Sequence, residues 1–181
     1  VLVESPAHPE RRYLLARGLE GPTSELVDNK PVDLRGLPEL ASFSGADLAG
    51  LQYQPLFVFS GTGTDAESDR GTNWSVVADP YVTLESGTGA VHVAPAFGED
   101  DHRVGLANGL GMYCALEANG RFKSHTGSLA GAWFKDTDPD IVTDLKRRGL
   151  LIRSTKYEHS YPHCWRHGTP LYYFATSSWF V

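Results

Sequence analysis

The middle of the chain reads Gly87-Thr88-Gly89-Ala90-Val91-His92-Val93-Ala94-Pro95-Ala96-Phe97-Gly98-Glu99-Asp100-Asp101. After a Gly-Thr-Gly turn the residues alternate, with the two valines on one face and His92 between two alanines on the other, which predicts a strand over 90–94. Pro95 cannot donate to a sheet ladder, so the strand should end there. Gly98 then permits a tight entry into a short helix that begins with three acidic residues.

This pattern places His92 toward a cleft beside an acidic helix start. The helix dipole and the free N–H groups of a first turn favour ionised carboxylates, so an anion fixed there could hold a substrate cation. A second interpretation is structural. A histidine on a strand is usually packed or partly exposed, and acidic residues at a helix start are usually caps. The residues alone leave both interpretations open.

Composition favours one domain over residues 1–181. The chain has 41% hydrophobic and 21% charged residues, near the globular average, and no apolar run long enough to span a bilayer. It begins with a strand-like segment and no secretion signal, as an excised domain would, and its two cysteines suggest no disulfide framework. We therefore expect a soluble, cytoplasmic protein without a membrane partner.

The net charge of −6 argues against broad binding to a nucleic-acid backbone. One basic cluster could contact RNA locally. The alternative interpretation is that these residues only form a solvated helix end. The cluster consists of Lys146, Arg147, Arg148, Arg153 and Lys156.

Short strands separated by Gly and Pro turns dominate the prediction. The clearest helix is Pro139–Arg148, with Asp138 as N-cap, an Asp144–Arg148 pair and Gly149 as its stop. The polar stretch 60–73 should be an exposed loop, and its Gly61-x-Gly63 lacks the rest of a phosphate-binding motif. Arg12–Leu19 fits a strand or a helix, and Val32–Leu40 a loop or a weak strand. Strands are expected at Val1–Glu4, Phe57–Phe59, Trp74–Val77, Tyr81–Leu84, Ala90–Ala94, Met112–Leu116, from Arg121 after an Asn119-Gly120 turn, Leu150–Arg153 and Leu171–Phe174. The expected fold is mainly β with a few helices (α+β), its β core closed on itself.

Two enzyme classes find little support in the sequence. The Gly-x-Ser-x-Gly motif of a serine hydrolase does not occur. Four potential zinc ligands lie within nine residues: His159, His163, Cys164 and His167. Two of them are adjacent and follow Pro162, which makes the backbone rigid, so the arrangement argues against a metal site.

Four stretches together resemble the inserted editing domain (connective polypeptide 1) of isoleucyl-tRNA synthetases. They are the stretch 87–101, the stretch Phe43-Ser44-Gly45-Ala46-Asp47-Leu48-Ala49-Gly50-Leu51-Gln52-Tyr53-Gln54-Pro55-Leu56-Phe57, and the pair Ser160–Leu171 and Ser178–Val181. The resemblance runs in order along the whole chain. It implies the barrel-like β core of the valyl, isoleucyl and leucyl editing domains, with residues 159–181 as the segment that returns to the synthetase core.

The resemblance also implies a reaction, the hydrolysis of valine misattached to isoleucine tRNA. Asp101 matches the position that pairs with the α-ammonium group, and His92 the position that helps to exclude the larger isoleucine. Four further residues are expected to shape the substrate pocket: Thr88, Gly89, Phe97 and Asp100. A second, hydrolytic site of this kind is needed because one methylene group changes the selectivity of an amino-acid binding site by only about 10- to 200-fold. Isoleucyl-tRNA synthetase is the standard example of this general limit.

The implied partners are the 3′ end of a tRNA carrying valine, a free amino acid or adenylate, and the rest of the synthetase. No metal or other cofactor is expected in this domain, since ATP and Mg²⁺ belong to the synthetase core outside the chain. A threonine-rich strand that forms the opposite wall in the family is absent here. The alternative function is therefore a non-catalytic β module that binds RNA or protein with an incomplete pocket.

Overall fold

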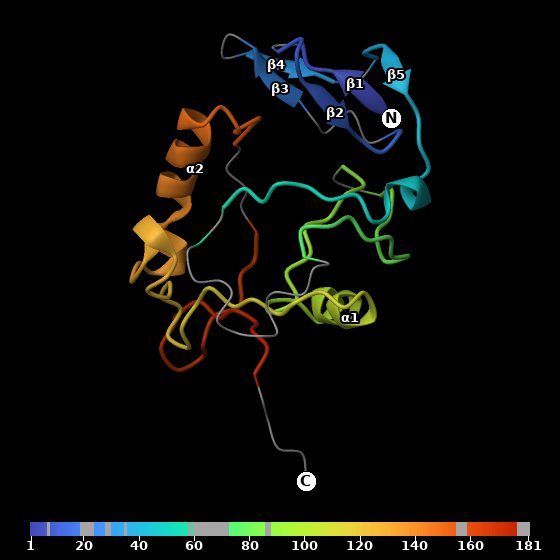
Figure 1. Cartoon of the computed structure of the whole chain (residues 1–181). Coiled ribbons are helices and arrows are strands. Elements are labelled where there is room, and N and C mark those ends of the chain that lie inside the picture. The colour runs from blue at the N-terminus through green and yellow to red at the C-terminus, as the bar shows by residue number, and fades with distance from the viewer. Residues whose placement is uncertain are drawn as a thin grey trace. The chain divides into compact units, whose positions relative to one another are not determined.

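The computed structural model describes residues 1–6, 8–18, 24–27, 30–34, 36–57, 59, 73–85, 88–154 and 159–176. The chain divides into two compact units, which are described separately, and Figure 1 labels their elements. Unit 1 comprises Val1–Gln52, Val76–His92 and Val142–Thr155, and unit 2 comprises Tyr53–Ser75, Val93–Ile141 and Lys156–Val181. No helix of the described residues is long and apolar enough to cross a membrane.

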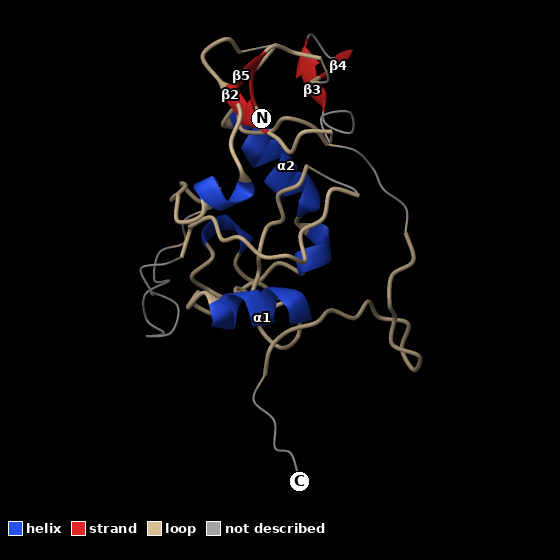
Figure 2. Cartoon of the chain, turned by 90° about the vertical axis from the view of Figure 1, so that its right-hand side faces the viewer, coloured by secondary structure: helices blue, strands red, loops and turns tan. Residues whose placement is uncertain are grey.

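Unit 1 holds the strands, drawn in red in Figure 2. Strand β1 (Leu2–Glu4) lies between β2 (Arg12–Leu14) and β5 (Glu39–Ala41), and both pairings are antiparallel. Strands β3 (Ser24–Val27) and β4 (Lys30–Asp33) form a separate antiparallel hairpin. The strand predicted at Val1–Glu4 is confirmed, and the undecided segment after Arg12 begins as a strand.

A small hydrophobic core lies at the end of β1. Val1, Val3, Leu15 and Leu34 are buried, and Tyr13 and Leu37 pack against them. The terminal amino group of Val1 donates to the Leu15 carbonyl at 2.6 Å, and the Leu15 amide donates back to Val1 at 2.9 Å. Burial of each aliphatic side chain stabilises this sheet by about 1.5–3 kcal/mol.

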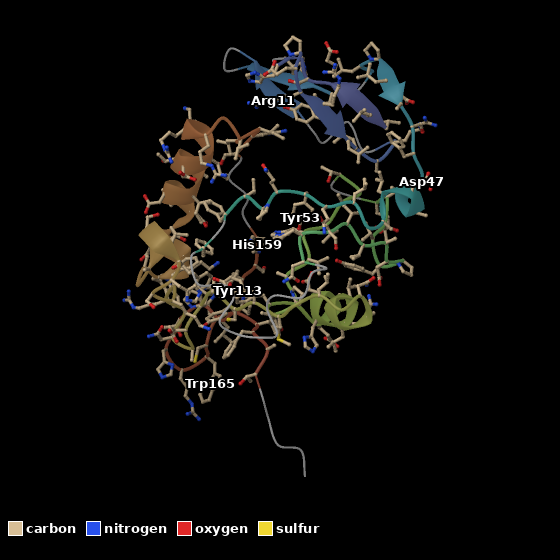
Figure 3. All side chains as sticks on the ribbon, in the orientation of Figure 1. Arg11, Asp47, Tyr53, Tyr113, His159 and Trp165 are labelled. Carbon is tan, nitrogen blue, oxygen red and sulfur yellow. The ribbon has the colours of Figure 1, made fainter. Side chains whose placement is uncertain are left out.

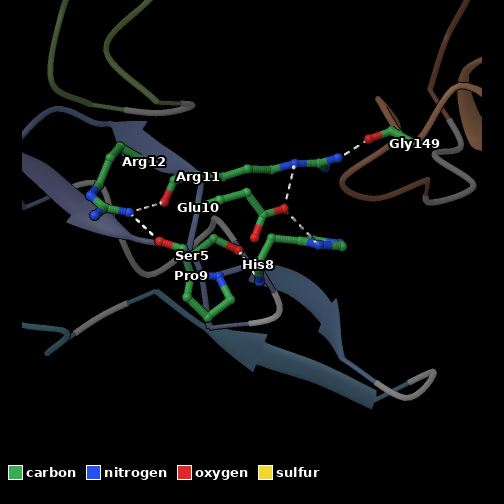
Figure 4. A network of polar contacts seen from close by, with 7 residues as sticks. All are labelled: Ser5, His8, Pro9, Glu10, Arg11, Arg12 and Gly149. Carbon is green, nitrogen blue, oxygen red and sulfur yellow. Dashed lines mark hydrogen bonds and ion pairs between the residues drawn. The ribbon is translucent and has the colours of Figure 1, made fainter.

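A polar network orders the turn between β1 and β2 (Figure 4). The Ser5 hydroxyl accepts from the His8 amide at 2.9 Å, and the Ser5 amide donates to the Arg11 carbonyl at 3.1 Å. The guanidinium of Arg11 then donates to the carbonyl of Gly149 at 2.7 Å. This bond joins the sheet to the turn that follows helix α2 within unit 1.

The predicted C-terminal helix is confirmed as α2 (Asp138–Arg147). Its first four residues belong to unit 2 and the rest to unit 1. Asp144 accepts from Arg148 at 3.0 Å, as predicted, and also from Arg147 at 2.6 Å. Gly149 ends the helix with φ +67°, a conformation that glycine adopts without strain.

The remaining helical elements are short. Helix α1 (Glu99–Ala107) lies in unit 2, together with the 3-10 turns η2 (Gly127–Leu129) and η3 (Phe134–Asp136). The 3-10 turn η1 (Gly45–Leu48) lies in unit 1, where Ser44 and Asp47 form a reciprocal capping box. Hydrogen bonding to Ser44, first from its backbone amide and then with its side chain, lowers the pKa of Asp47.

Most of the other predicted strands are wrong. The described residues of 57–59, 74–77, 81–84, 90–94, 112–116, 121–123, 150–153 and 171–174 form no strand, and only isolated bridges occur among them. The cause is the lack of a continuous partner, because an apolar alternating segment becomes a strand only when a neighbour bonds its backbone over several residues. The predicted turn at Asn119-Gly120 does occur, with bonds between Glu117 and Arg121 and a bridge from Leu116 to Phe122.

The fold is therefore mixed α+β. Its described strands have three or four residues each, and together they contain no more residues than its described helices. The expectation of a mainly β fold is therefore wrong for the described residues. The three-stranded sheet is open within the described residues, and the barrel-like core stays a prediction. The predicted loop over 60–73 lies outside the described residues except for Asn73.

Candidate functional site

Helix α1 begins where the sequence predicts. Gly98 is its N-cap, with φ −139° and ψ 147°, and Glu99, Asp100 and Asp101 fill the first turn. The positive end of the helix dipole lies at this first turn and favours acidic side chains there. The helix start is thus a local concentration of negative charge in unit 2.

The three carboxylates differ in their surroundings. Asp100 is exposed and lies 3.5 Å from Arg103, one turn along the helix, and Glu99 is also exposed. Asp101 is half-buried, and its side chain folds back over Gly98. A Cβ atom built on residue 98 would lie 2.1 Å from the Oδ2 atom of Asp101, so only glycine leaves this space to the carboxylate. Among these acids, Asp101 is the one whose carboxylate lies over the N-cap residue.

The turn before the helix is packed firmly. Ala96 and Val104 are buried, and Gly105 lies so close to Pro95 that a Cβ there would meet the proline ring at 2.9 Å. The Nδ1 atom of His102 lies 3.2 Å from the Pro95 carbonyl. The amide of Ala175 also donates to the Ala96 carbonyl at 2.8 Å. The turn is therefore packed against α1 and also bonded to the C-terminal segment.

Phe97 occupies the last position of this turn. Its amide donates to the carbonyl of Ala94 at 2.8 Å, and its side chain is half-buried. This geometry fits the structural interpretation of Phe97 as well as the expected role in a pocket, and the predicted role stays a prediction.

Thr88 and Gly89 lie in unit 1, beside the end of β2. The Ala16 amide donates to the Thr88 carbonyl at 2.9 Å, and a Cβ on Gly89 would lie 2.2 Å from the Cβ of Ala16. Gly89 also has φ +74°, which side-chain-bearing residues rarely adopt. Gly89 thus lies at a close approach to Ala16, which explains this glycine without a ligand.

His92 is exposed and belongs to unit 1, whereas Asp101 belongs to unit 2. The strand expected to present the imidazole does not form, because residues 90–94 have no ladder partner in the described chain. The prediction that His92 and Asp101 face one cleft stays a prediction.

Outside this stretch, unit 2 contains one titratable pair that the sequence gave no reason to select. The hydroxyl of Tyr113 lies 2.8 Å from the Nε2 atom of His125. Burial, followed by the nearby Cys114, raises the pKa of Tyr113. The two residues are twelve positions apart, and only the fold brings them together.

The histidines and cysteine of the C-terminal segment do not form a cluster. The Cys164 sulfur lies 3.2 Å from Nδ1 of His167, while His159 and His163 contact backbone carbonyls beside them. In the described part of the chain, no three His, Cys, Asp or Glu residues are close enough to hold a metal ion. Cys114 and Cys164 are both free thiols.

The proposed basic cluster is partly neutralised. Asp144 binds Arg147 and Arg148, and these hydrogen bonds, that of Arg147 first, lower the pKa of its carboxyl group. Lys156 lies outside the described residues. This arrangement agrees with a solvated helix end.

Sequence reasoning missed the role of Gly98. It identified the glycine as an entry to the helix, but not as the space into which Asp101 folds. The signal available in the sequence is the spacing Gly-x-x-Asp, since the N-cap and the third helical residue face each other at a helix start.

Comparison with known proteins places these residues in a family, although no family model matches the chain. The isoleucine–tRNA ligase of Thermobifida fusca is 45% identical over 179 residues, which cover 96% of this chain and 16% of the relative. The enzyme of Nocardia farcinica is 41% identical over the same shares of the two chains. The cytoplasmic isoleucine–tRNA ligase of Arabidopsis thaliana is 45% identical over 147 residues, or 78% of this chain and 12% of the relative. The chain thus spans about one sixth of the length of these relatives, and it belongs to the isoleucine–tRNA ligase family.

Proposed function

We propose that this chain is the editing domain of an isoleucine–tRNA ligase and hydrolyses the ester between valine and isoleucine tRNA. The observation that carries the proposal is the carboxylate of Asp101, folded over Gly98 at the start of α1. Family membership supports it, because the stretch around this carboxylate is the one that resembles the editing domain. The barrel-like core and a cytoplasmic location belong to the same proposal.

The proposed chemistry needs little more than position. An aminoacyl ester is already activated, so the protein has to hold the ester, fix the α-ammonium group and orient a water molecule. Asp101 would bind the ammonium. An ion pair of about 4 Å at an effective dielectric of roughly 20 supplies about 4 kcal/mol before the cost of desolvation. A half-buried side chain has less freedom to lose when the substrate arrives than an exposed one.

The remaining residues have proposed roles in selection. His92 would limit the space for the amino-acid side chain in the pocket, so that valine is accepted and isoleucine is excluded. Thr88, Gly89, Phe97 and Asp100 would shape the surrounding wall. The partners would be the 3′ end of a valylated tRNA, with adenylate as a second possible substrate, and the rest of the ligase. ATP and Mg²⁺ would serve that remainder, while the hydrolytic step would need neither a metal nor a cofactor.

The test measures the hydrolysis of valine from isoleucine tRNA that has been mischarged with valine. It uses the 181-residue chain and three variants. Asp101→Ala and Asp101→Asn should abolish hydrolysis, because both remove the charge that binds the ammonium. Glu99→Gln is the matched control, since it removes an exposed acid from the same helical turn, and it should keep the parental rate. Full activity in folded Asp101→Asn would remove the proposed role. No activity in the parent would favour the non-catalytic module.

A further inference from the structure

Helix α1 contains a histidine whose ring reaches back beyond the helix. His102 is partly buried, and its Nδ1 atom lies 3.2 Å from the carbonyl oxygen of Pro95, seven residues earlier. Two exposed histidines of unit 2, His159 and His163, also contact backbone carbonyls through Nδ1, but these carbonyls lie only one and two residues away. Figure 3 labels His159. Unlike these local contacts, the bond of His102 joins a helix to the turn that precedes it.

The direction of this hydrogen bond follows from the chemistry of its two atoms. A carbonyl oxygen only accepts, so the proton must be on Nδ1 of His102. A neutral imidazole carries one proton, and the bond therefore selects the tautomer that has this proton on Nδ1. A protonated imidazole carries a proton on both nitrogens and makes the same bond. His102 is thus a donor to Pro95 in either form.

The turn over Pro95–Gly98 is held without a strand ladder. The segment that leads into it forms no strand among the described residues. Inside the turn, the Phe97 amide donates to the Ala94 carbonyl at 2.8 Å, and the Ala96 carbonyl accepts from the Ala175 amide at 2.8 Å. Neither bond ties the turn to α1. The position of the turn relative to the helix therefore depends on other contacts.

His102 and Gly105 supply these contacts from one face of α1. A Cβ built on Gly105 would lie 2.9 Å from two ring atoms of Pro95, so the glycine lets the proline ring pack directly on the helix. The imidazole of His102, three residues earlier on the same face, binds the carbonyl of Pro95. The backbone amide of His102 also donates to the Gly98 carbonyl at 2.8 Å. His102 thus binds the turn at both of its ends.

We infer that His102 is a positioning residue for the proposed hydrolysis, because its bond to the Pro95 carbonyl sets where Gly98 lies beneath the Asp101 carboxylate. The inference rests on the proposed function and assigns no chemistry to the imidazole itself. Without the bond, the turn could move relative to α1, and the space over Gly98 into which Asp101 folds would move with it. A misplacement of about 1 Å is enough to lower a rate about 100-fold when position carries the catalysis.

The experiment compares His102→Leu with His102→Asn in the hydrolysis of valine from mischarged isoleucine tRNA by the 181-residue chain. Leucine keeps a branched side chain but has no donor, so kcat/KM should fall by at least about tenfold. Asparagine places an amide nitrogen one bond beyond Cγ, as Nδ1 is in histidine, so it should stay within about threefold of the parent. Asparagine is no base, so its activity would also exclude a general-base role for His102.

His163→Leu is the matched control. It removes the same kind of bond, from a histidine Nδ1 to a backbone carbonyl, at an exposed position elsewhere in unit 2. Its rate of hydrolysis should equal that of the parent.

Hydrogen exchange of the Phe97 amide gives a second measurement, which does not depend on the reaction. This amide is bonded to Ala94 inside the turn, so its exchange rate reports how often the turn opens. Exchange should be faster in His102→Leu than in the parent and unchanged in His102→Asn. If the parent does not hydrolyse the ester, the proposed function fails. Faster exchange in His102→Leu alone would then still support the hold of the turn by His102, and equal exchange would overturn it.

Three results would overturn the inference: parental hydrolysis by His102→Leu, an equal loss in both variants, or the same Phe97 exchange rate in the parent and the two variants. An equal loss would show that the imidazole is needed for something other than the proton on Nδ1.

Discussion

Gly98→Ala provides a way to move the Asp101 carboxylate without removing it. A Cβ at position 98 would lie 2.1 Å from Oδ2, 3.0 Å from Cγ and 3.4 Å from Cβ of Asp101. Normal contact between carbon and oxygen requires more than 3 Å, so the carboxylate must shift by about 1 Å. A displacement of this size can lower a reaction rate about 100-fold when geometry carries the catalysis. We therefore expect a loss of about two orders of magnitude in kcat/KM for deacylation.

The fold should tolerate this change. The backbone of Gly98 has φ −139° and ψ 147°, which alanine adopts freely. Alanine is a poorer N-cap than glycine by up to about 1 kcal/mol, but the lower entropy of the unfolded chain returns about 0.4–1 kcal/mol. Thermal or urea unfolding should thus change by less than about 1 kcal/mol. Gly45→Ala is the matched control, because a Cβ there meets no atom within 4 Å.

A double-mutant cycle makes the reasoning refutable. If Gly98 acts only through the carboxylate, adding Gly98→Ala to Asp101→Ala should cost no further activity. Additive losses would mean that residue 98 contributes in another way, such as through its own amide. Parental activity in Gly98→Ala itself would contradict the claim that the position of the carboxylate matters.

Three further predictions address other parts of the chain. His92→Ala should leave hydrolysis of valyl-tRNA largely intact but allow hydrolysis of isoleucyl-tRNA, and unchanged rejection of the isoleucyl ester would contradict the sieve. Gly89→Ala should lower the free energy of unfolding by about 2–3 kcal/mol in urea titrations, because its Cβ would overlap that of Ala16 at a positive φ. The pKa of Asp144 is lowered by its two arginine partners, so its contribution to helix stability should be complete above the ordinary value of 3.8 and disappear as the pH falls through the lowered pKa. Carboxyl NMR titration should show this pKa rising in Arg147→Gln.

Local signals in the sequence predicted the helices. The Asp-Pro start and glycine stop of α2 act within a few residues, as do the acids and glycine at the start of α1. The strands were overpredicted for the opposite reason. The alternation around Val91 and Val93 indicates which side chains would share a face of a strand. It does not indicate whether another strand lies beside this one, because a neighbouring strand comes from a distant part of the sequence.

The same distinction separates the parts of the candidate site that sequence could predict. It identified Asp101 as an acid of a first helical turn, since that depends on a local pattern. The local pattern alone could not distinguish this carboxylate from that of Asp100, and only the family resemblance selected Asp101, because the difference depends on side-chain direction: one lies over Gly98 and the other toward Arg103. The charge of Asp100 is turned outward beside an arginine and exposed, whereas the carboxylate of Asp101 is half-buried over the N-cap of the helix. The proposed recognition of an ammonium group therefore depends less on the presence of three acids than on the single glycine that lets one of them fold back.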